Sequence, residues 1–404
     1  MLSLKKTLSF REFLSRIAAF LILVAKMRNY RPVLVLAPLV LLSGCQGPEP
    51  DGSTVIRPSR TGASPRSVTG DQNWDAGVRT DFVDRVLLVS VDGLGAVYLG
   101  GPLHHGRYQT LQKLRDQGSS TLNARTDCDY TVTLPNHTSM LTGRPVAPDP
   151  NLPSNAYHGW TSDGYSTSDE TLHNSGNPNV TYISSVFDVA HDNGLRTCMY
   201  AGKSKFSLYS TSYDATNGAI DHVGADNGRN KIDHVVIIDY DSDTLIAQAT
   251  ADFDHEICDF AFVHIAETDL VGHDSGWGTP EWLVEVDRVD DWLRQLAEHT
   301  IFADNHSWGA IVTADHGGDL DGHGDNSDPW DYTIPFIAIG PNLTPGSDLY
   351  ELAQASRRDP GQRQLRYSEP WQPIRNGEAA NVALGMLGLP PIAGSFMRGL
   401  VVPQ

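Results

Sequence analysis

The chain has 404 residues, of which 40% are hydrophobic and 20% are charged, and its formal net charge is −19. This is ordinary globular composition, long enough for one large α/β domain or two smaller ones. The acidic excess argues against a nucleic-acid polymer as partner, because such a partner requires a basic surface. It leaves a small anionic substrate open, since bound metal ions can reverse the sign of the local electrostatic field.

The N-terminal region carries an apolar run, residues 32–42, which is too short to span a bilayer comfortably and follows Arg28 and Arg31. The sequence Leu-Ser-Gly-Cys then ends at Cys45. Together these features resemble a bacterial lipoprotein signal, which implies that Cys45 is acylated and becomes the mature N-terminus. Met27 begins a segment of typical signal length and is a candidate start of translation. An uncleaved membrane anchor is the alternative, and both place the rest of the chain outside the cytoplasm.

Three segments are therefore expected: a signal in residues 1–45, a flexible Gly/Pro/Ser-rich linker in residues 46–78, and a catalytic domain in residues 79–404. The lipid anchor would tether the protein in the bacterial cell envelope, on the periplasmic or outer surface. The catalytic domain keeps three cysteines, Cys128, Cys198 and Cys258, without a C-x-x-C motif for structural zinc. An oxidising compartment permits one disulfide bond, and the spacing does not say which pair forms it. Buried thiols that pack as small apolar side chains are the simplest interpretation.

Apolar runs alternate with helical patterns through the predicted catalytic domain. Strands are predicted in residues 83–91, 196–200, 234–239 and 259–265, at the start of 308–318, and in 334–340. Helices are predicted in residues 185–193, 280–299 and about 378–387, and the polar stretch 131–143 is interpreted as a loop before a helix that begins near Thr138. This alternation predicts an α/β fold with one mostly parallel sheet sandwiched between helices.

Acidic and imidazole side chains follow three of the predicted strands. Six of them are candidate metal ligands: Asp92, Asp269, His273, Asp315, His316 and His323. Because ligands gather beyond the carboxyl ends of parallel strands, we expect these side chains to meet there. A set of carboxylates and imidazoles without cysteine suits zinc, or a similar divalent transition metal such as manganese or iron, better than calcium or magnesium.

Six ligands are too many for a single catalytic zinc ion that keeps an open position, so they predict two metal ions with three protein ligands each. Two metals roughly 4 Å apart are the usual apparatus for in-line displacement at phosphorus. Thr133 is the candidate nucleophile, provided that a metal lowers its hydroxyl pKa. Asn136 is positioned three residues later to donate an amide N–H to a phosphoryl oxygen.

Four motifs carry a family resemblance: VSVDG, TLPNHTSMLTG, D-x-x-x-H, and ADHGG with a later H-G. Their order and spacing over about residues 82–397 resemble the alkaline phosphatase superfamily, in particular type I phosphodiesterase/nucleotide pyrophosphatase. The resemblance implies one zinc ion held by Asp92, Thr133, Asp315 and His316, and a second held by Asp269, His273 and His323. It also implies a phospho-threonine intermediate that water releases, and thus hydrolysis of phosphodiester or pyrophosphate bonds in small nucleotide-like substrates.

Lys203 and Lys205, in the stretch AGKSKF, favour a different specificity. They resemble lysines that bind phosphate or phosphonate in phosphonoacetate hydrolases and some monoesterases of this superfamily. The alternative function is therefore a phosphomonoesterase or phosphonate hydrolase, unless the two lysines are simply solvated. A metal-binding lipoprotein without turnover is the rival from another class. The sequence leaves the leaving group and the oligomeric state open.

Overall fold

The structure is a computed structural model that describes residues 82–100, 106–221, 223, 228–303, 307–320 and 322–400. The predicted signal with Cys45, the candidate start Met27 and the predicted linker lie outside the described residues. The described residues form an α/β domain around an eight-stranded sheet. Within them, no helix combines the length and apolar character needed to cross a membrane.

The sheet has the strand order β4-β3-β5-β1-β6-β7-β2-β8. Its strands are β1 (Arg85–Val91), β2 (Ser119–Arg125), β3 (Thr197–Ala201), β4 (His234–Ile237), β5 (Phe260–Ile265), β6 (Trp308–Thr313), β7 (Thr333–Ile339) and β8 (Ser347–Asp348). Among these, only β7 runs against the common direction, because it pairs antiparallel with both β6 and β2. The predicted mostly parallel sheet is confirmed.

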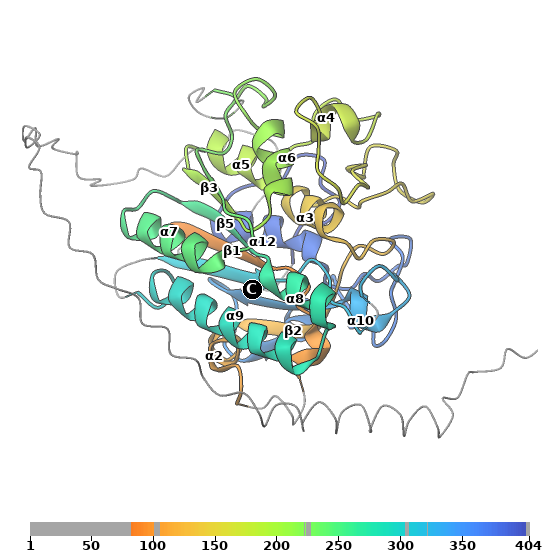
Figure 1. Ribbon diagram of the computed structural model, residues 1–404. Helices are drawn as coiled ribbons and strands as arrows, with labels where there is room; N and C mark the ends of the chain where they lie inside the picture. The colour runs from red at the N-terminus through yellow and green to blue at the C-terminus, as the bar shows by residue number, and fades with distance from the viewer. Residues whose placement is uncertain are drawn as a thin grey trace, which may run out of the picture. The chain divides into compact units, whose positions relative to one another are not determined.

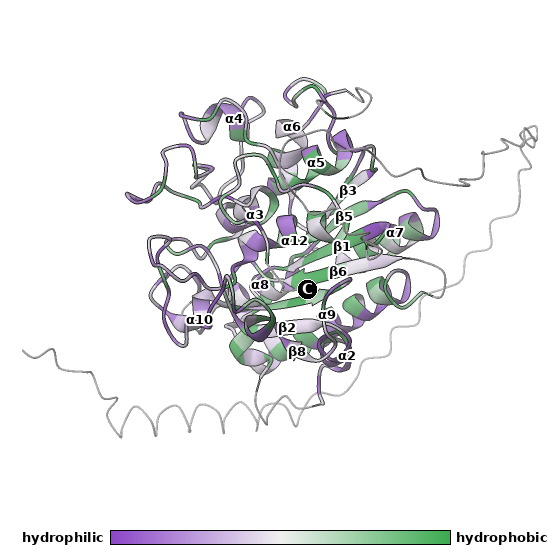
Figure 2. Cartoon of the chain, turned by 180° about the vertical axis from the view of Figure 1, so that it is seen from behind, coloured by the Kyte–Doolittle hydropathy of each residue, from purple (hydrophilic) through white to green (hydrophobic). Residues whose placement is uncertain are grey.

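Helices cover both faces of the sheet (Figure 1). On one face, α9 (Pro280–Glu298) contacts α2 (Gln109–Gln117) and α7 (Ser242–Asp254). On the other, α12 (Ala379–Met386) lies against β1 and β6 and contacts α3 (Thr133–Thr142) and α5 (Val186–Asp192). The short elements are α4 (Leu172–Ser175), α6 (Ser207–Ser212), α8 (Glu267–Ser275), α10 (Pro329–Tyr332), α11 (Leu349–Leu352), η2 (Ala96–Tyr98), η3 (Ser204–Phe206) and η4 (Asn376–Glu378). Figure 2 shows hydrophobic colouring along the central strands β5 and β1.

The long helix α9 confirms the prediction made from its apolar spacing. The Thr279 side chain accepts a hydrogen bond from the backbone N–H of Trp282 and caps the helix, and Pro280 fits the first turn because no N–H is needed there. The face that packs inward consists of residues three or four apart, including Trp282, Val286, Val289, Leu293 and Leu296. Burial of this stripe fixes the rotation of α9 on the sheet.

Helix α3 corrects the predicted start near Thr138, because it begins five residues earlier, at Thr133. Pro135 is compatible with this start, since a proline in the first helical turn removes an N–H that has no intrahelical partner. The helix ends at Gly143, whose φ is 66°. A Cβ there would lie 2.8 Å from Asn381 Nδ2, so glycine is required for space as well as for backbone conformation. The candidate nucleophile is thus the first residue of a buried helix rather than part of a loop.

The structure also decides the pairing of the cysteines. A disulfide bond joins Cys198, in β3, to Cys258, which lies just before β5. Cys128 is a buried free thiol. The bond therefore links two neighbouring strands of the sheet, β3 and β5, whose carboxyl ends lie beside the site described below.

Candidate metal centre and nucleophile

Four neighbouring parallel strands, β3, β5, β1 and β6, end at the same edge of the sheet. Beyond these ends lie Lys203 after β3, Asp269 in α8 after β5, Asp92 directly after β1, and Asp315 after β6. Side chains that are far apart in the sequence meet here because parallel strands all present their carboxyl ends to one edge. The fold therefore places the predicted residues at a single site.

Asp92, Asp315 and His316 form the first group of candidate ligands, with one ligand atom from each within 4.8 Å of the others. His316 Nε2 lies 3.3 Å from Asp92 Oδ1 and 3.4 Å from Asp315 Oδ2. All three residues are fully buried. Asp315 is held in place because its Oδ1 accepts the backbone N–H groups of Gly93 at 3.0 Å and His316 at 2.9 Å.

Asp269, His316 and His323 form the second group, again within 4.8 Å of one another. Asp269 Oδ1 lies 3.4 Å from Nε2 of His323 and 3.4 Å from Nε2 of His273. The Nε2 atoms of His273 and His323 are 3.0 Å apart. All six predicted ligands are thus brought together. His316 is shared by both groups, whereas the resemblance assigned it to the first alone.

Three buried ligand atoms without hydrogen-bond partners indicate that the site can hold metal ions. Asp269 Oδ1, Asp315 Oδ2 and His316 Nε2 are buried and have no hydrogen-bond partner among the described residues. Buried polar atoms without a partner are costly and uncommon. Carboxylate oxygen and imidazole nitrogen are ligands of zinc and related transition metals, and a divalent cation would satisfy all three atoms.

Backbone carbonyls orient the two buried imidazoles. His316 Nδ1 lies 2.7 Å from the carbonyl oxygen of Gly317, and His323 Nδ1 lies 2.6 Å from that of Thr131. A carbonyl can only accept, so each Nδ1 donates, and each Nε2 is the ring nitrogen that presents a lone pair to the cluster once the imidazole is neutral. This is the arrangement that supports imidazole ligation of a metal.

The electrostatics of the site are dominated by carboxylates. Burial alone would raise the pKa of Asp92, but Lys203, His264 and His316 outweigh burial and hold it well below its usual value. Asp315 shows the opposite balance, since burial and the charge of Asp92 raise its pKa well above the usual value. Asp92 and Asp315 interact with the same cationic side chains, Lys203 and His316, so the site has more carboxylates than the chain's own cations can pair with.

Thr133 lies beside the first group. Its side chain is buried, and its Oγ1 donates to Asp92 Oδ1 at 3.4 Å. His137, one helical turn later, has Nδ1 2.8 Å from the Thr133 carbonyl oxygen and Nε2 2.8 Å from Ser90 Oγ. Ser90 belongs to β1, so His137 fastens the N-terminal turn of α3 to the strand that supplies Asp92.

The structure gives Asn136 a different task from the predicted phosphoryl contact. Its side-chain amide donates to the carbonyl oxygens of Tyr130, at 2.9 Å, and Val132, at 3.1 Å. Its Oδ1 accepts the backbone N–H of Asp127 at 2.9 Å and Asn376 Nδ2 at 3.2 Å. Every donor and acceptor of this fully buried amide is engaged. Asn136 therefore shapes the segment that leads into Thr133, and it has no free N–H for a substrate.

Lys203 and Lys205 occupy different surroundings. Lys203 is buried, and its Nζ lies 2.6 Å from Asp92 Oδ2 and 2.6 Å from Asp269 Oδ2. Burial lowers the pKa of Lys203, but these two carboxylates outweigh burial and raise it above the usual value. Lys205 Nζ instead lies 3.0 Å from Asp163 Oδ1. Lys203 therefore bridges the two ligand groups, while Lys205 is part of a separate ion pair.

His264 and Thr268 also support the site and were not predicted from the sequence. His264 Nε2 lies 2.9 Å from Asp92 Oδ2, and Thr268 Oγ1 donates to the Asp92 carbonyl oxygen at 2.5 Å. His264 sits in β5 beside Ser90 of β1. The signal that marks His264 is a polar residue near the end of an otherwise apolar buried strand, close to the edge where ligands gather.

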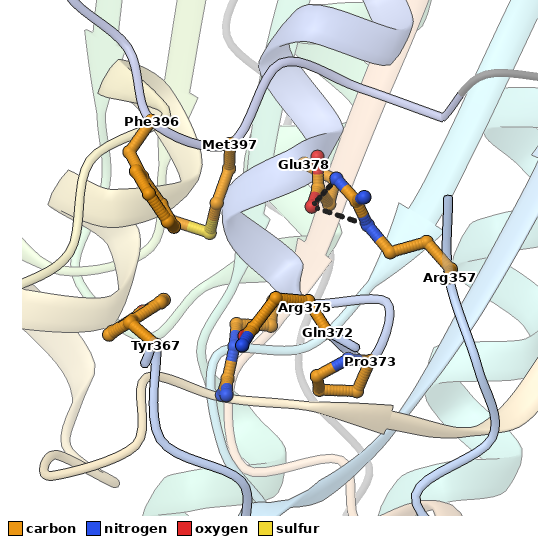
Figure 3. A pocket seen from close by; sticks show the side chains of 8 residues that line it. All are labelled: Arg357, Tyr367, Gln372, Pro373, Arg375, Glu378, Phe396 and Met397. Carbon is orange, nitrogen blue, oxygen red and sulfur yellow. Dashed lines mark hydrogen bonds and ion pairs between the residues drawn. The ribbon is translucent and has the colours of Figure 1, made fainter. Parts of the chain in front are cut away.

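A separate cavity of about 100 Å³ lies beside η4 (Figure 3). In its wall, Arg357 Nη2 lies 2.6 Å from Glu378 Oε1, and the Arg375 guanidinium lies over the Tyr367 ring at 4.6 Å. Arg375 Nη1 also donates to the Thr126 carbonyl oxygen at 2.6 Å. None of the candidate metal ligands lines this cavity. Its wall supports the chain that leads toward Thr133.

Residues 86–330 match the sequence profile of the family described as Type I phosphodiesterase / nucleotide pyrophosphatase. This match covers more than half of the chain. None of the curated protein sequences matches the chain significantly.

Solved structures with a similar fold include murine ectonucleotide pyrophosphatase / phosphodiesterase 5, as an inactive threonine-to-alanine variant in complex with AMP. It is 14% identical, with a TM-score of 0.50 over 79% of this chain and 100% of that chain. A second structure of the murine protein has 14% identity and a TM-score of 0.50 over 78% of this chain and 100% of its own. Phosphonoacetate hydrolase from Sinorhizobium meliloti, in complex with phosphonoformate, has 20% identity and a TM-score of 0.39 over 58% of this chain and 57% of its own. At these identities the two murine structures show a shared fold.

Proposed function

This chain belongs to the type I phosphodiesterase / nucleotide pyrophosphatase family and is a phosphoric-ester hydrolase, and on that premise we propose that it cleaves phosphodiester or pyrophosphate bonds in small nucleotide-like substrates, with Thr133 as the nucleophile. One observation carries the proposal. The Thr133 hydroxyl lies 3.4 Å from Asp92 Oδ1, beside two groups of carboxylate and imidazole ligands that meet at the carboxyl edge of the sheet.

Two divalent metal ions complete the proposed site. Asp92, Asp315 and His316 would hold one, and Asp269, His273 and His323 the other. Zinc is the first choice from the donor set, and other divalent transition metals remain compatible with it. Metal ions bound there would lower the pKa of the Thr133 hydroxyl and neutralise charge on the phosphoryl oxygens. Asp92 alone is a poor base for this hydroxyl, because its own pKa lies well below its usual value.

The proposed reaction proceeds through two displacements at phosphorus. Thr133 Oγ1 forms a bond to phosphorus as the bond to the leaving oxygen breaks, while the hydroxyl proton passes to solvent and the leaving group takes one up. Water then attacks the phospho-threonine, the bond from phosphorus to Oγ1 breaks, and the hydroxyl regains a proton. Two in-line displacements retain the configuration at phosphorus. His137 fixes the Thr133 backbone through its 2.8 Å contact with the carbonyl oxygen, so the hydroxyl keeps one orientation.

A phosphomonoesterase or phosphonate hydrolase is the second candidate function, and the position of Lys203 favours it. This ammonium group lies 2.6 Å from a carboxylate of each ligand group, within reach of the reacting centre. A doubly charged monoester requires additional positive charge, however, and the charges of Lys203 and Lys205 are already balanced by carboxylates. Hydrolysis of phosphodiesters therefore has stronger support than hydrolysis of monoesters.

The test compares kcat/KM for bis-p-nitrophenyl phosphate with kcat/KM for p-nitrophenyl phosphate, using the full chain loaded with zinc. We expect a preference for the diester of about a hundredfold, or about 2.7 kcal/mol in activation free energy. Thr133→Ala should remove zinc-dependent turnover of both substrates while the protein still binds zinc. A preference for the monoester would replace the proposal with the second candidate, and turnover that survives Thr133→Ala would exclude the threonine mechanism.

We also propose that the enzyme works outside the cytoplasm, anchored to a membrane through lipid on Cys45. The signal-like N-terminal sequence supports this location. The disulfide bond between Cys198 and Cys258 is compatible with it, because such bonds persist in oxidising compartments.

A further inference from the structure

The segment that joins α3 to α4 folds back onto the N-terminal turn of α3. Asp163, in this segment, accepts the backbone N–H of Leu134 with its Oδ1 at 2.7 Å. Leu134 directly follows Thr133, so standard bond lengths place the Asp163 carboxylate within about 6 Å of the Thr133 Cα atom. A negative charge is therefore held beside the residue that is proposed to attack phosphorus.

Lys205 is the cationic partner of this carboxylate. Its Nζ lies 3.0 Å from Asp163 Oδ1 and 3.1 Å from Asp163 Oδ2. The Lys205 side chain is 12% exposed and that of Asp163 is 38% exposed. Lys205 therefore does not present a free positive charge to a substrate, whereas Asp163 directs its Oδ1 at the Leu134 N–H. The lysine predicted to bind phosphate is thus neutralised by a residue that sequence analysis did not consider.

The Leu134 N–H is chemically important because of its position. Backbone N–H groups next to a nucleophile, and those at the N-terminus of a helix, are the usual donors to negative charge that develops during acyl and phosphoryl transfer. Here such a donor is directed at a carboxylate of the chain itself. A phosphoryl oxygen that approaches this N–H comes close to the Asp163 carboxylate, and the repulsion between the two anionic groups increases with the charge of the phosphoryl group.

We propose that Asp163 sets the charge selectivity of the active site, favouring a reacting phosphoryl group with one negative charge over one with two. A phosphodiester carries one negative charge. A monoester has a second pKa of about 6, so it carries two negative charges at a pH well above that value. The inference rests on the proposed function, which locates the reaction at Thr133. It concerns how Asp163 changes the ratio of kcat/KM between diester and monoester, and not which of the two is the better substrate. Asp163 is a specificity-determining residue, and it takes no part in bond making.

The first experiment measures kcat/KM for bis-p-nitrophenyl phosphate and p-nitrophenyl phosphate at pH 8 in the zinc-loaded full chain and in Asp163→Asn. The asparagine keeps the shape and one acceptor oxygen and removes the charge. We expect the diester-to-monoester ratio to fall about tenfold, equivalent to 1.4 kcal/mol, mainly because the monoester improves. Asp169→Asn is the matched control. Asp169 lies in the same segment, is exposed and accepts a hydrogen bond from Ser168, so its substitution should leave the ratio unchanged.

Two further variants separate charge from structure. Lys205→Gln removes the opposite charge and should raise the ratio, and the double variant Asp163→Asn/Lys205→Gln should return it toward the wild-type value. A purely structural role predicts that Asp163→Asn lowers kcat/KM for both substrates equally. A ratio that stays within twofold of wild type in Asp163→Asn overturns the proposal.

Failure of the proposed function remains distinguishable from failure of this inference. A wild-type enzyme that prefers monoesters would contradict the proposed function, yet the ratio in Asp163→Asn would still report on Asp163. If neither substrate is turned over, calorimetric binding of inorganic phosphate and dimethyl phosphate gives the same comparison without chemistry. Asp163→Asn should then strengthen binding of inorganic phosphate relative to dimethyl phosphate about tenfold, and an unchanged relative affinity would overturn the inference.

Discussion

His316 is the residue that most directly couples protonation to metal binding, because it belongs to both ligand groups. Burial lowers the pKa of its imidazole, but Asp315 and Asp92 outweigh burial and raise the pKa to about 10. His316 is therefore protonated at neutral pH in the metal-free protein. His323 differs, since burial and the charge of His316 lower its pKa to about 3, so it is already neutral.

Zinc affinity is accordingly expected to increase with pH. A metal ion can bind His316 only after its proton leaves, so the dissociation constant for zinc should decrease by up to about tenfold per pH unit below pH 10. A competition assay with a fluorescent zinc chelator at pH 6.5, 7.5 and 8.5 measures this slope. His316→Gln should weaken binding and flatten the slope, whereas replacing His299, a half-buried residue after α9 that contacts Asp254, should change neither. A pH-independent dissociation constant in the wild type would contradict the prediction.

At the scale of secondary-structure elements, the disulfide bond ties β3 to the chain entering β5. It closes a loop with a sequence separation of 60. In the chain-entropy description, a loop of that length stabilises the folded state by about 4 kcal/mol, because it restricts the unfolded chain. Urea unfolding of the double variant Cys198→Ala/Cys258→Ala should show a decrease in the free energy of unfolding of that order.

Two controls accompany this measurement. Cys128→Ala removes a buried free thiol and reports the cost of lost packing without loss of a bond. Dithiothreitol should destabilise the wild type and leave the double variant unchanged. Equal stability of the wild type and the double variant would show that the bond contributes nothing to the fold.

Strand β2 was not predicted from the sequence, for a physical reason. Strand β2 reads SSTLNAR and has no apolar run, yet most of its residues are buried because their polar atoms find partners. Ser119 Oγ, for example, donates to the Thr344 carbonyl oxygen at 2.9 Å. Such compensation depends on segments more than two hundred residues away, so hydrophobic periodicity cannot predict this strand.

For the whole molecule, the proposed lipid anchor predicts where the protein is found. Cys45→Ser removes the thiol that would be acylated, so the protein should move from the membrane fraction to the soluble fraction or accumulate with its signal attached. Fractionation of expressing cells with an immunoblot measures both outcomes, and Cys128→Ser is a control that leaves the N-terminal region intact. Stable membrane association of an unprocessed, unlipidated wild-type chain would favour an uncleaved anchor instead.

The sequence by itself determined the fold class and the residues that meet at the site. Buried parallel strands are continuous apolar runs, and the residues that follow such strands converge at one edge of the sheet, so Asp92, Asp269, Asp315 and their histidines could be predicted from local pattern and chain order alone. The same holds for α9, whose apolar spacing and capping residues are local signals.

Only the tertiary structure decided which polar atoms are free and which are already bonded. Asn136 was expected to contact a substrate, but partners at Tyr130, Val132 and Asp127 use all its hydrogen-bonding capacity together with Asn376. Hydrogen bonds and ion pairs form between whichever groups the fold brings within about 3 Å. That distance depends on the packing of segments far apart in the chain, which sequence spacing does not encode. For the same reason, the neutralisation of Lys205 by Asp163 is a property of the folded domain and not of the motif that contains the lysine.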